Sequence, residues 1–126
     1  MNTTAPRVFA FRYGVFRLLL TVLGMGPGLS RVALGADTLH VRMGWAFQAK
    51  VPRDRITSAE AVSGLVGGIG VHGWGGRWLV NGAASGLVKI TFEPAGRARM
   101  VIPVKLTQLT VSLEDPDGFI AAVGKS

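Results

Sequence analysis

The chain has 126 residues, a formal net charge of +7 and no cysteine. This length suits one domain with one core, and the absence of cysteine excludes disulfides, thiolate catalysis and cysteine-ligated metal. Residues 1–55 carry a net charge of +6 and residues 56–126 only +1. We therefore expect a cytoplasmic domain whose basic N-terminal half can make weak contact with an anionic membrane.

Residues 1–29 are expected to form a leading segment that packs on the core. Three arginines followed by the apolar run Leu18–Leu23 also match the pattern of a signal peptide, but glycine and proline in residues 24–28 interrupt the apolar run. Only 13 uncharged residues separate the last of these arginines from the next one, whereas a membrane-spanning helix needs about 20. Over residues 8–24 the pattern fits both a strand and a helix, and both remain open.

Three alternating runs after residue 29 predict an antiparallel meander. Residues 30–34 and 38–43 alternate apolar and polar side chains, and the intervening Gly35-Ala36-Asp37 favours a hairpin turn. A third run ends at Pro52, and its buried face is expected to carry Trp45, Phe47, Ala49 and Val51. The outward positions of the three runs then include Arg31, His40, Arg42, Gln48 and Lys50.

The middle of the chain is richest in glycine. Residues 55–62 are compatible with a short helix, through the capping spacing of Thr57 and Glu60, or with a strand, and we favour the strand. The stretch 63–86 does not suit a helix because glycine disfavours it. It contains Asn81-Gly82, a signal for a hairpin turn.

Alternation returns in the last third of the chain. Apolar and polar side chains alternate over residues 88–93, which predicts a strand with one buried face. Pro94-Ala95-Gly96 then predicts a turn, residues 99–106 a strand interrupted by Pro103, and residues 109–113 a further strand.

The pattern becomes helical at the C-terminal end. Asp115 is placed as an N-cap, Pro116 suits the first helical position, and Asp117 complements the helix dipole. Phe119, Ile120 and Val123 form an apolar stripe, and Gly124 is a stop signal. We expect a helix over residues 115–124 that covers one end of the core.

Three segments, residues 37–44, 51–59 and 109–120, resemble bacterial pleckstrin-homology-like domains. Residues 70–74 and 76–82 also resemble a group of small actinobacterial proteins, which implies no activity. Together with the alternating runs, the resemblance implies a mainly β single domain spanning residues 1–126. Its sheet, residues 30–113, is expected to be an antiparallel roll or partly open barrel of about seven to nine strands closed by the C-terminal helix. The basic signature by which eukaryotic pleckstrin-homology loops bind phosphoinositides has no counterpart here.

The candidate site residues lie in the glycine-rich stretch. Residues 68–73 spell the G-x-G-x-x-G of a dinucleotide loop, but that motif needs a helix and more glycines follow, so we expect no cofactor. Two histidines without a third ligand nearby do not favour a metal. Tryptophan and arginine are common in interface hot spots, although the tryptophans also suit core positions. The candidate binding residues are therefore His72, Trp74, Arg77 and Trp78.

These patterns favour a non-enzymatic binding module for a protein, a peptide or an anionic membrane surface. Two alternatives stay open: a carrier of small apolar ligands with a cavity inside a closed barrel, and an enzyme that uses His72 as an acid or base. Nucleic acid is disfavoured because no helix-turn-helix pattern and no basic strand with exposed aromatic residues is present. A homo-oligomer formed through an unpaired strand edge is also compatible with the sequence.

Overall fold

The computed structural model describes residues 6–14, 17–63, 70–83, 85–100 and 103–124, with the backbone alone at Gly70, His72 and Trp74. In chain order the elements are β1 (Arg7–Phe9), α1 (Arg17–Val22), η1 (Pro27–Leu29), β2 (Ser30–Leu34), β3 (Thr38–Met43), β4 (Phe47–Pro52), η2 (Arg53–Arg55), β5 (Ile56–Val62), β6 (Gly70–Trp74), β7 (Arg77–Asn81), β8 (Leu87–Arg99), β9 (Pro103–Ser112) and α2 (Pro116–Val123).

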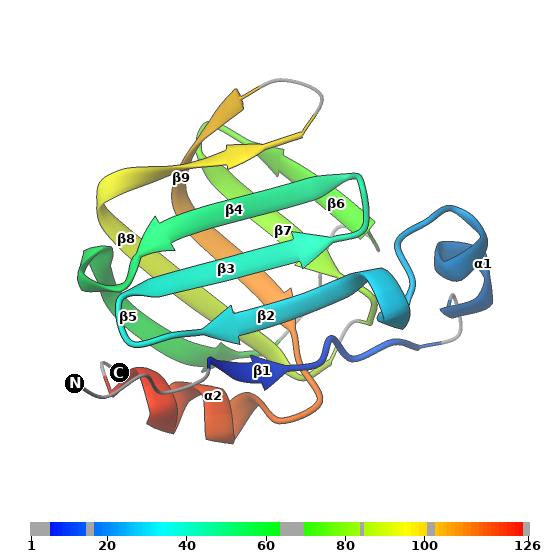
Figure 1. Cartoon of the computed structure of the whole chain (residues 1–126), viewed down its shortest axis with the longest axis horizontal. Coiled ribbons are helices and arrows are strands. Elements are labelled where there is room, and N and C mark those ends of the chain that lie inside the picture. The colour runs from blue at the N-terminus through cyan, green and yellow to red at the C-terminus, as the bar shows by residue number, and fades with distance from the viewer. Residues whose placement is uncertain (1–5, 15–16, 64–69, 84, 101–102, 125–126) are drawn as a thin grey trace.

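Nine strands form one curved sheet in the order β1-β2-β3-β4-β8-β9-β7-β6, and β5 pairs with β8 beside that path (Figure 1). The pairings are antiparallel except that of β7 with β9, which is parallel. Within the described residues the sheet is open: β1 and β6 end the path, and β5 pairs with β8 alone. The expected mainly β fold with one C-terminal helix is confirmed.

The core lies between the curved halves of the sheet and under α2. Strands β3 and β4 bury every second side chain, as the alternation predicts. Phe92, Val111 and Phe119, which come from β8, β9 and α2, are all buried in the same cluster. The largest fully buried side chains are Phe47, Phe119, Leu39, Met43, Ile56, Ile90, Leu106, Leu109, Leu113, Val32, Val41 and Val51.

The first hairpin and the strand after Pro52 follow the sequence prediction. In the hairpin of β2 and β3, Val32 lies opposite Val41, and the Gly35 N–H donates to the Thr38 carbonyl at 2.8 Å. Residues 56–62 form strand β5 and not a helix, because they pair along β8 from Ile56 to Val62.

The second hairpin turns at Gly75-Gly76, so the predicted turn at Asn81-Gly82 is wrong. Gly75 and Gly76 have φ values of +62° and +88°, the left-handed backbone that a two-residue hairpin turn requires. Asn81 instead ends β7 in the interior, where its side-chain amide donates to the Ala83 carbonyl at 2.9 Å. At Gly82 a Cβ would lie 2.6 Å from the Tyr13 ring, so glycine is needed there for close packing.

Strand β8 runs without a break through Pro94-Ala95-Gly96, where a turn was predicted. Its first half pairs with β5 and β9, and its second half pairs with β4 and β9, with a register shift between Thr91 and Gly96. A Cβ on Gly96 would lie 3.0 Å from the methyl groups of Val51, so glycine lets β8 pass close to β4. The strands predicted over residues 99–106 and 109–113 are confirmed only in part: β8 ends at Arg99, and one strand, β9, runs from Pro103 to Ser112.

The two ends of the chain meet over the core. Residues 8–24 contain both elements that the sequence left open, strand β1 and helix α1. In α2 the Asp115 side chain accepts a hydrogen bond from the Gly118 N–H at 3.0 Å, and Gly124 ends the helix with φ of +73°. Phe119 of α2 meets Phe9 of β1 edge to face, with ring centroids 5.2 Å apart. The predicted capping helix is confirmed.

Candidate functional site

The outer face of the sheet is basic. Alternation in β2, β3 and β4 turns Arg31, Arg42 and Lys50 toward solvent. Arg31 lies directly opposite Arg42 across the β2–β3 pair. Sequence alternation predicts this outward set, and the structure confirms it.

The basic surface continues onto β8 and β9. Arg99 lies opposite Gln48 across the β4–β8 pair, and Arg97 lies opposite Lys105 across the β8–β9 pair. All three of these cations are exposed. We call the resulting set the basic face, and it consists of Arg31, Arg42, Lys50, Arg97, Arg99 and Lys105.

Acidic side chains are scarce around the basic face. The described outward positions on β2, β3, β4, on β8 from Gly96 to Arg99 and at the start of β9 carry no Asp or Glu, while the exposed Glu93 lies further back on β8. In the part of the chain that the structure describes, the one ion pair joins Lys89 to Glu60 at 3.0 Å, away from this face. The cations therefore project a positive field into solvent.

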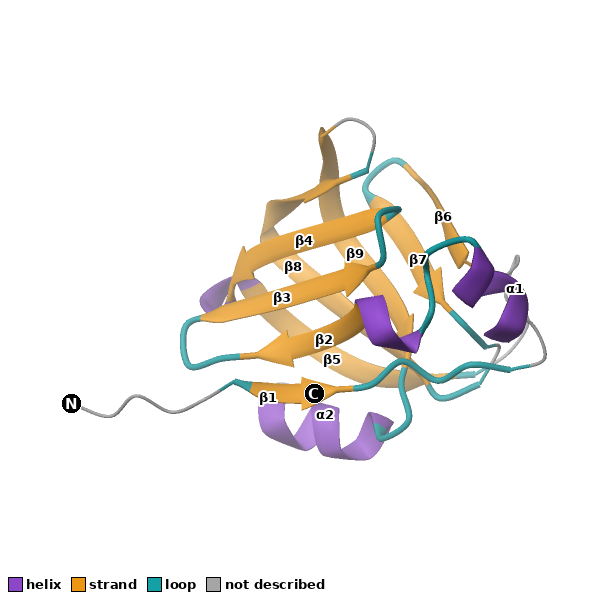
Figure 2. Ribbon diagram, turned by 45° about the vertical axis from the view of Figure 1, so that its right-hand side comes forward, coloured by secondary structure: helices purple, strands orange, loops and turns teal. Residues whose placement is uncertain are grey.

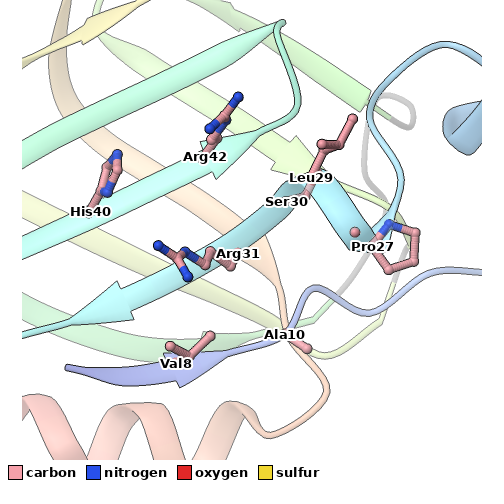
Figure 3. Close-up of a pocket in the computed structure, with 9 residues that line it drawn as sticks. Val8, Ala10, Pro27, Leu29, Ser30, Arg31, His40 and Arg42 are labelled. Atoms are coloured by element: carbon pink, nitrogen blue, oxygen red, sulfur yellow. The ribbon is translucent and has the colours of Figure 1, made fainter. Parts of the chain in front are cut away.

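A hollow of about 330 Å³ lies at one end of the basic face (Figure 3). Arg31, His40 and Arg42 project from β2 and β3 on its polar side. Its remaining lining is mostly apolar or small, with Val8, Ala10, Pro27, Gly28, Leu29 and Ser30. The hollow thus joins cationic groups to an apolar wall.

The pKa of His40 reflects the positive charge of this face. Partial burial lowers the pKa of its imidazole, and the positive charges of Arg31, Lys50 and Arg42 lower the pKa further. Its ring nitrogen Nε2 lies 3.5 Å from the Gln48 side-chain nitrogen, with no carboxylate among these neighbours. The surroundings of His40 are therefore suited to receive an anion.

Beside the basic face the chain exposes a cluster of large apolar side chains around α1. Leu18 and Val22 of α1 are 77% and 76% exposed, and Trp45 in the β3–β4 turn is 68% exposed. We call this cluster the apolar tip, and it consists of Leu18, Leu19, Val22, Leu23, Leu29 and Trp45. Helix α1 stands beside the sheet and not over its core (Figures 1 and 2).

Trp45 does not share the buried face of β4, so its predicted core position is wrong. The strand begins at Phe47, and residues 44–46 form the turn before it. The Trp45 indole N–H donates to the Leu23 carbonyl at 2.6 Å, which gives the ring a hydrogen-bond partner at the surface. The turn therefore brings Trp45 onto the apolar tip.

Close backbone contacts fix the tip to the sheet. Gly44 has a φ of +51°, and a side chain there would collide with the Gly24 carbonyl. The Gly44 N–H is placed to donate to both the Leu29 carbonyl and the Ser30 hydroxyl. Arg42 of the basic face donates to the Gly44 carbonyl at 3.2 Å, so the basic face and the apolar tip share one turn.

The residues predicted as a binding site lie elsewhere, on the β6–β7 hairpin. Trp78 packs partly against the core, and its indole N–H donates to the Lys105 carbonyl at 3.1 Å. Arg77 is exposed. His72 pairs with Leu79 and Trp74 pairs with Arg77 along the backbone, while the side chains of His72 and Trp74 lie outside the described part. Their role in binding stays a prediction.

The dinucleotide-like motif does not lead into a helix. Gly70 to Gly73 belong to strand β6, and the first two residues of the motif lie outside the described residues. Within the described side chains, no group of three or more His, Asp or Glu residues is placed to hold a metal ion. Of the helices that the structure describes, neither is long and apolar enough to cross a membrane.

Comparisons with known proteins give no relative for this arrangement. No protein-family model matches the chain, and no match was found among curated proteins or solved structures. The resemblance to pleckstrin-homology-like domains therefore stays a prediction, and function has to be argued from the surface itself.

Proposed function

We propose that this chain is a non-enzymatic binding module that docks on an anionic partner through its basic face. One observation carries the proposal: cations from five strands lie on one surface, and Glu93 is the one acidic side chain among the described outward positions of those strands. The surroundings of His40 also favour the binding of an anion, because its described neighbours are cations and an amide.

The charge on this face suffices for transient binding. A basic side chain near an anionic membrane contributes about 1 kcal/mol, so six would contribute roughly 6 kcal/mol, which corresponds to a dissociation constant of about 40 µM. Salt screens exposed charges over about 8 Å at physiological ionic strength. The interaction is therefore expected to weaken strongly as salt is added.

Nucleic acid fits this surface less well than a protein, a peptide or a membrane. Proteins that bind single strands stack the bases on aromatic side chains set among the cations. The described outward positions of the basic face carry no Phe, Tyr or Trp. The one aromatic ring among them is the imidazole of His40. The face offers charge without stacking platforms.

The test distinguishes the effect of clustering the cations on one face from the effect of the net charge of the chain. The variant Arg31→Gln, Arg42→Gln, Lys50→Gln removes three charges from the face. The matched control Arg7→Gln, Arg17→Gln, Lys89→Gln removes the same charge from positions outside the basic face. On a phosphocellulose column, the face variant should elute at markedly lower salt than the control, because clustered cations bind a polyanion cooperatively.

Equal elution of the two triple variants would contradict the proposal, because it would show that total charge and not its arrangement governs binding. Thermal unfolding of both variants checks that the fold is intact. Exposed surface substitutions usually change stability by less than about 0.5 kcal/mol, so both should unfold close to the wild type.

A further inference from the structure

We propose that the anionic partner is a lipid bilayer, with the apolar tip inserted between the headgroups while the basic face lies on the charged surface. This inference rests on the proposed function and names the partner of the same face. It is carried by the juxtaposition of the two surfaces across the β3–β4 turn, where Arg42 donates to Gly44 and Trp45 follows directly.

The side chains of α1 are arranged for contact outside the molecule. Of its leucines, Leu20 alone is buried and anchors the helix to the core. Leu18, Leu19 and Val22 point away from the core and are more than half exposed. A short helix that packs only on its own domain would bury its longest apolar stripe, and α1 exposes most of it.

Trp45 occupies the border between the apolar tip and the basic face. Tryptophan is enriched where a protein meets the boundary between hydrocarbon and water, because its ring is apolar and its N–H is polar. Here the N–H is already bonded to the Leu23 carbonyl, so the ring can enter an apolar layer without leaving that donor unpaired.

The charges around the tip favour a bilayer over a second copy of this chain. A symmetric dimer through the apolar tip would set two equivalent surfaces against each other, and would bring two basic faces together with Arg31 and Arg42 close to the interface. An anionic bilayer supplies an apolar layer and negative charge side by side. The tip and the face together match that combination.

The test uses the full chain and sedimentation with vesicles of phosphatidylcholine alone or with phosphatidylglycerol added. Wild-type protein should sediment with the anionic vesicles and remain in solution with the neutral ones. The variant Leu18→Ser, Val22→Ser should bind the anionic vesicles at least about tenfold more weakly, because both side chains are lost from the inserted surface. The control Ala61→Ser, Ala121→Ser changes two exposed apolar residues on β5 and α2, and it should change binding less than about twofold.

Trp45 supplies a second measurement that does not depend on affinity. Its fluorescence should shift to shorter wavelength on anionic vesicles, as the ring leaves water. In a Trp45→Phe variant that still sediments, this shift should be lost. An unchanged shift in that variant would show that Trp45 stays outside the bilayer, and would overturn insertion of the tip.

The outcomes separate this inference from the proposed function. If the Leu18→Ser, Val22→Ser variant binds anionic vesicles like the wild type, tip insertion is wrong, while the phosphocellulose result still decides the role of the basic face. If the wild type binds neither kind of vesicle, the bilayer is not the partner. A dimer in light scattering that this double variant dissociates would assign the tip to self-association instead.

Discussion

His40 shows at the scale of one residue how the basic face affects stability. Burial and three cations hold its pKa below the ordinary value of 6.5. Below that pH the unfolded chain binds more protons than the folded one, so stability is lost as pH falls through 6.5 and then through the folded pKa. We compare the melting temperature of the His40→Gln variant with that of the wild type at each pH. The difference, variant minus wild type, should be larger at about pH 5 than at about pH 7.5.

Circular dichroism at the two pH values checks this expectation. The carboxylates titrate in both proteins, so the difference between the melting temperatures isolates His40. If that difference is the same at both pH values, folding does not lower the pKa of His40.

Single residues also show where sequence reasoning about the site stopped. Alternation predicts that Arg31, Arg42 and Lys50 face outward, and this is confirmed. Alternation predicts that Trp45 is buried, because it lies two residues before the buried Phe47. Residues 44–46 form a turn instead, and Trp45 is exposed. A glycine just before the alternating run was the available signal for that turn.

At the scale of elements, α2 depends on its cap. The Asp115 carboxylate accepts the Gly118 N–H, and removing such a cap usually costs about 1 kcal/mol. Asp117 lies exposed in the first turn and acts only through the helix dipole, for about 0.3 kcal/mol or slightly more. Urea unfolding should therefore show a clearly larger loss for Asp115→Ala than for Asp117→Ala, and equal losses would contradict the role of the cap.

Local elements were predictable, while long-range pairing was not. The first hairpin, strand β5 and helix α2 follow from turn residues, alternation and capping within a few positions. Strand β8 was divided in error at Pro94-Ala95-Gly96, because its continuity is maintained by pairing with β4 and β9. The same pairing adds Arg97, Arg99 and Lys105 to the basic face, so half of that face belongs to the chain half that has little net charge.

For the whole molecule, contact between the two ends of the chain contributes to stability. Phe119 is fully buried and Phe9 nearly so, with their rings packed edge to face. Phe119→Ala should lower the free energy of unfolding by about 3–5 kcal/mol. In a double-mutant cycle with Phe9→Ala, the two losses should fall short of additivity by about 0.5–1.5 kcal/mol. Strict additivity in urea unfolding would show that the ring pair adds nothing of its own.

Strand β8 gives the sheet a common spine. It pairs with β5 in its first half, with β4 near its end and with β9 on the other side, so separating either half of the sheet would break the pairing of this one strand. The two halves of the sheet should therefore not unfold independently, and the protein should melt in a single cooperative step.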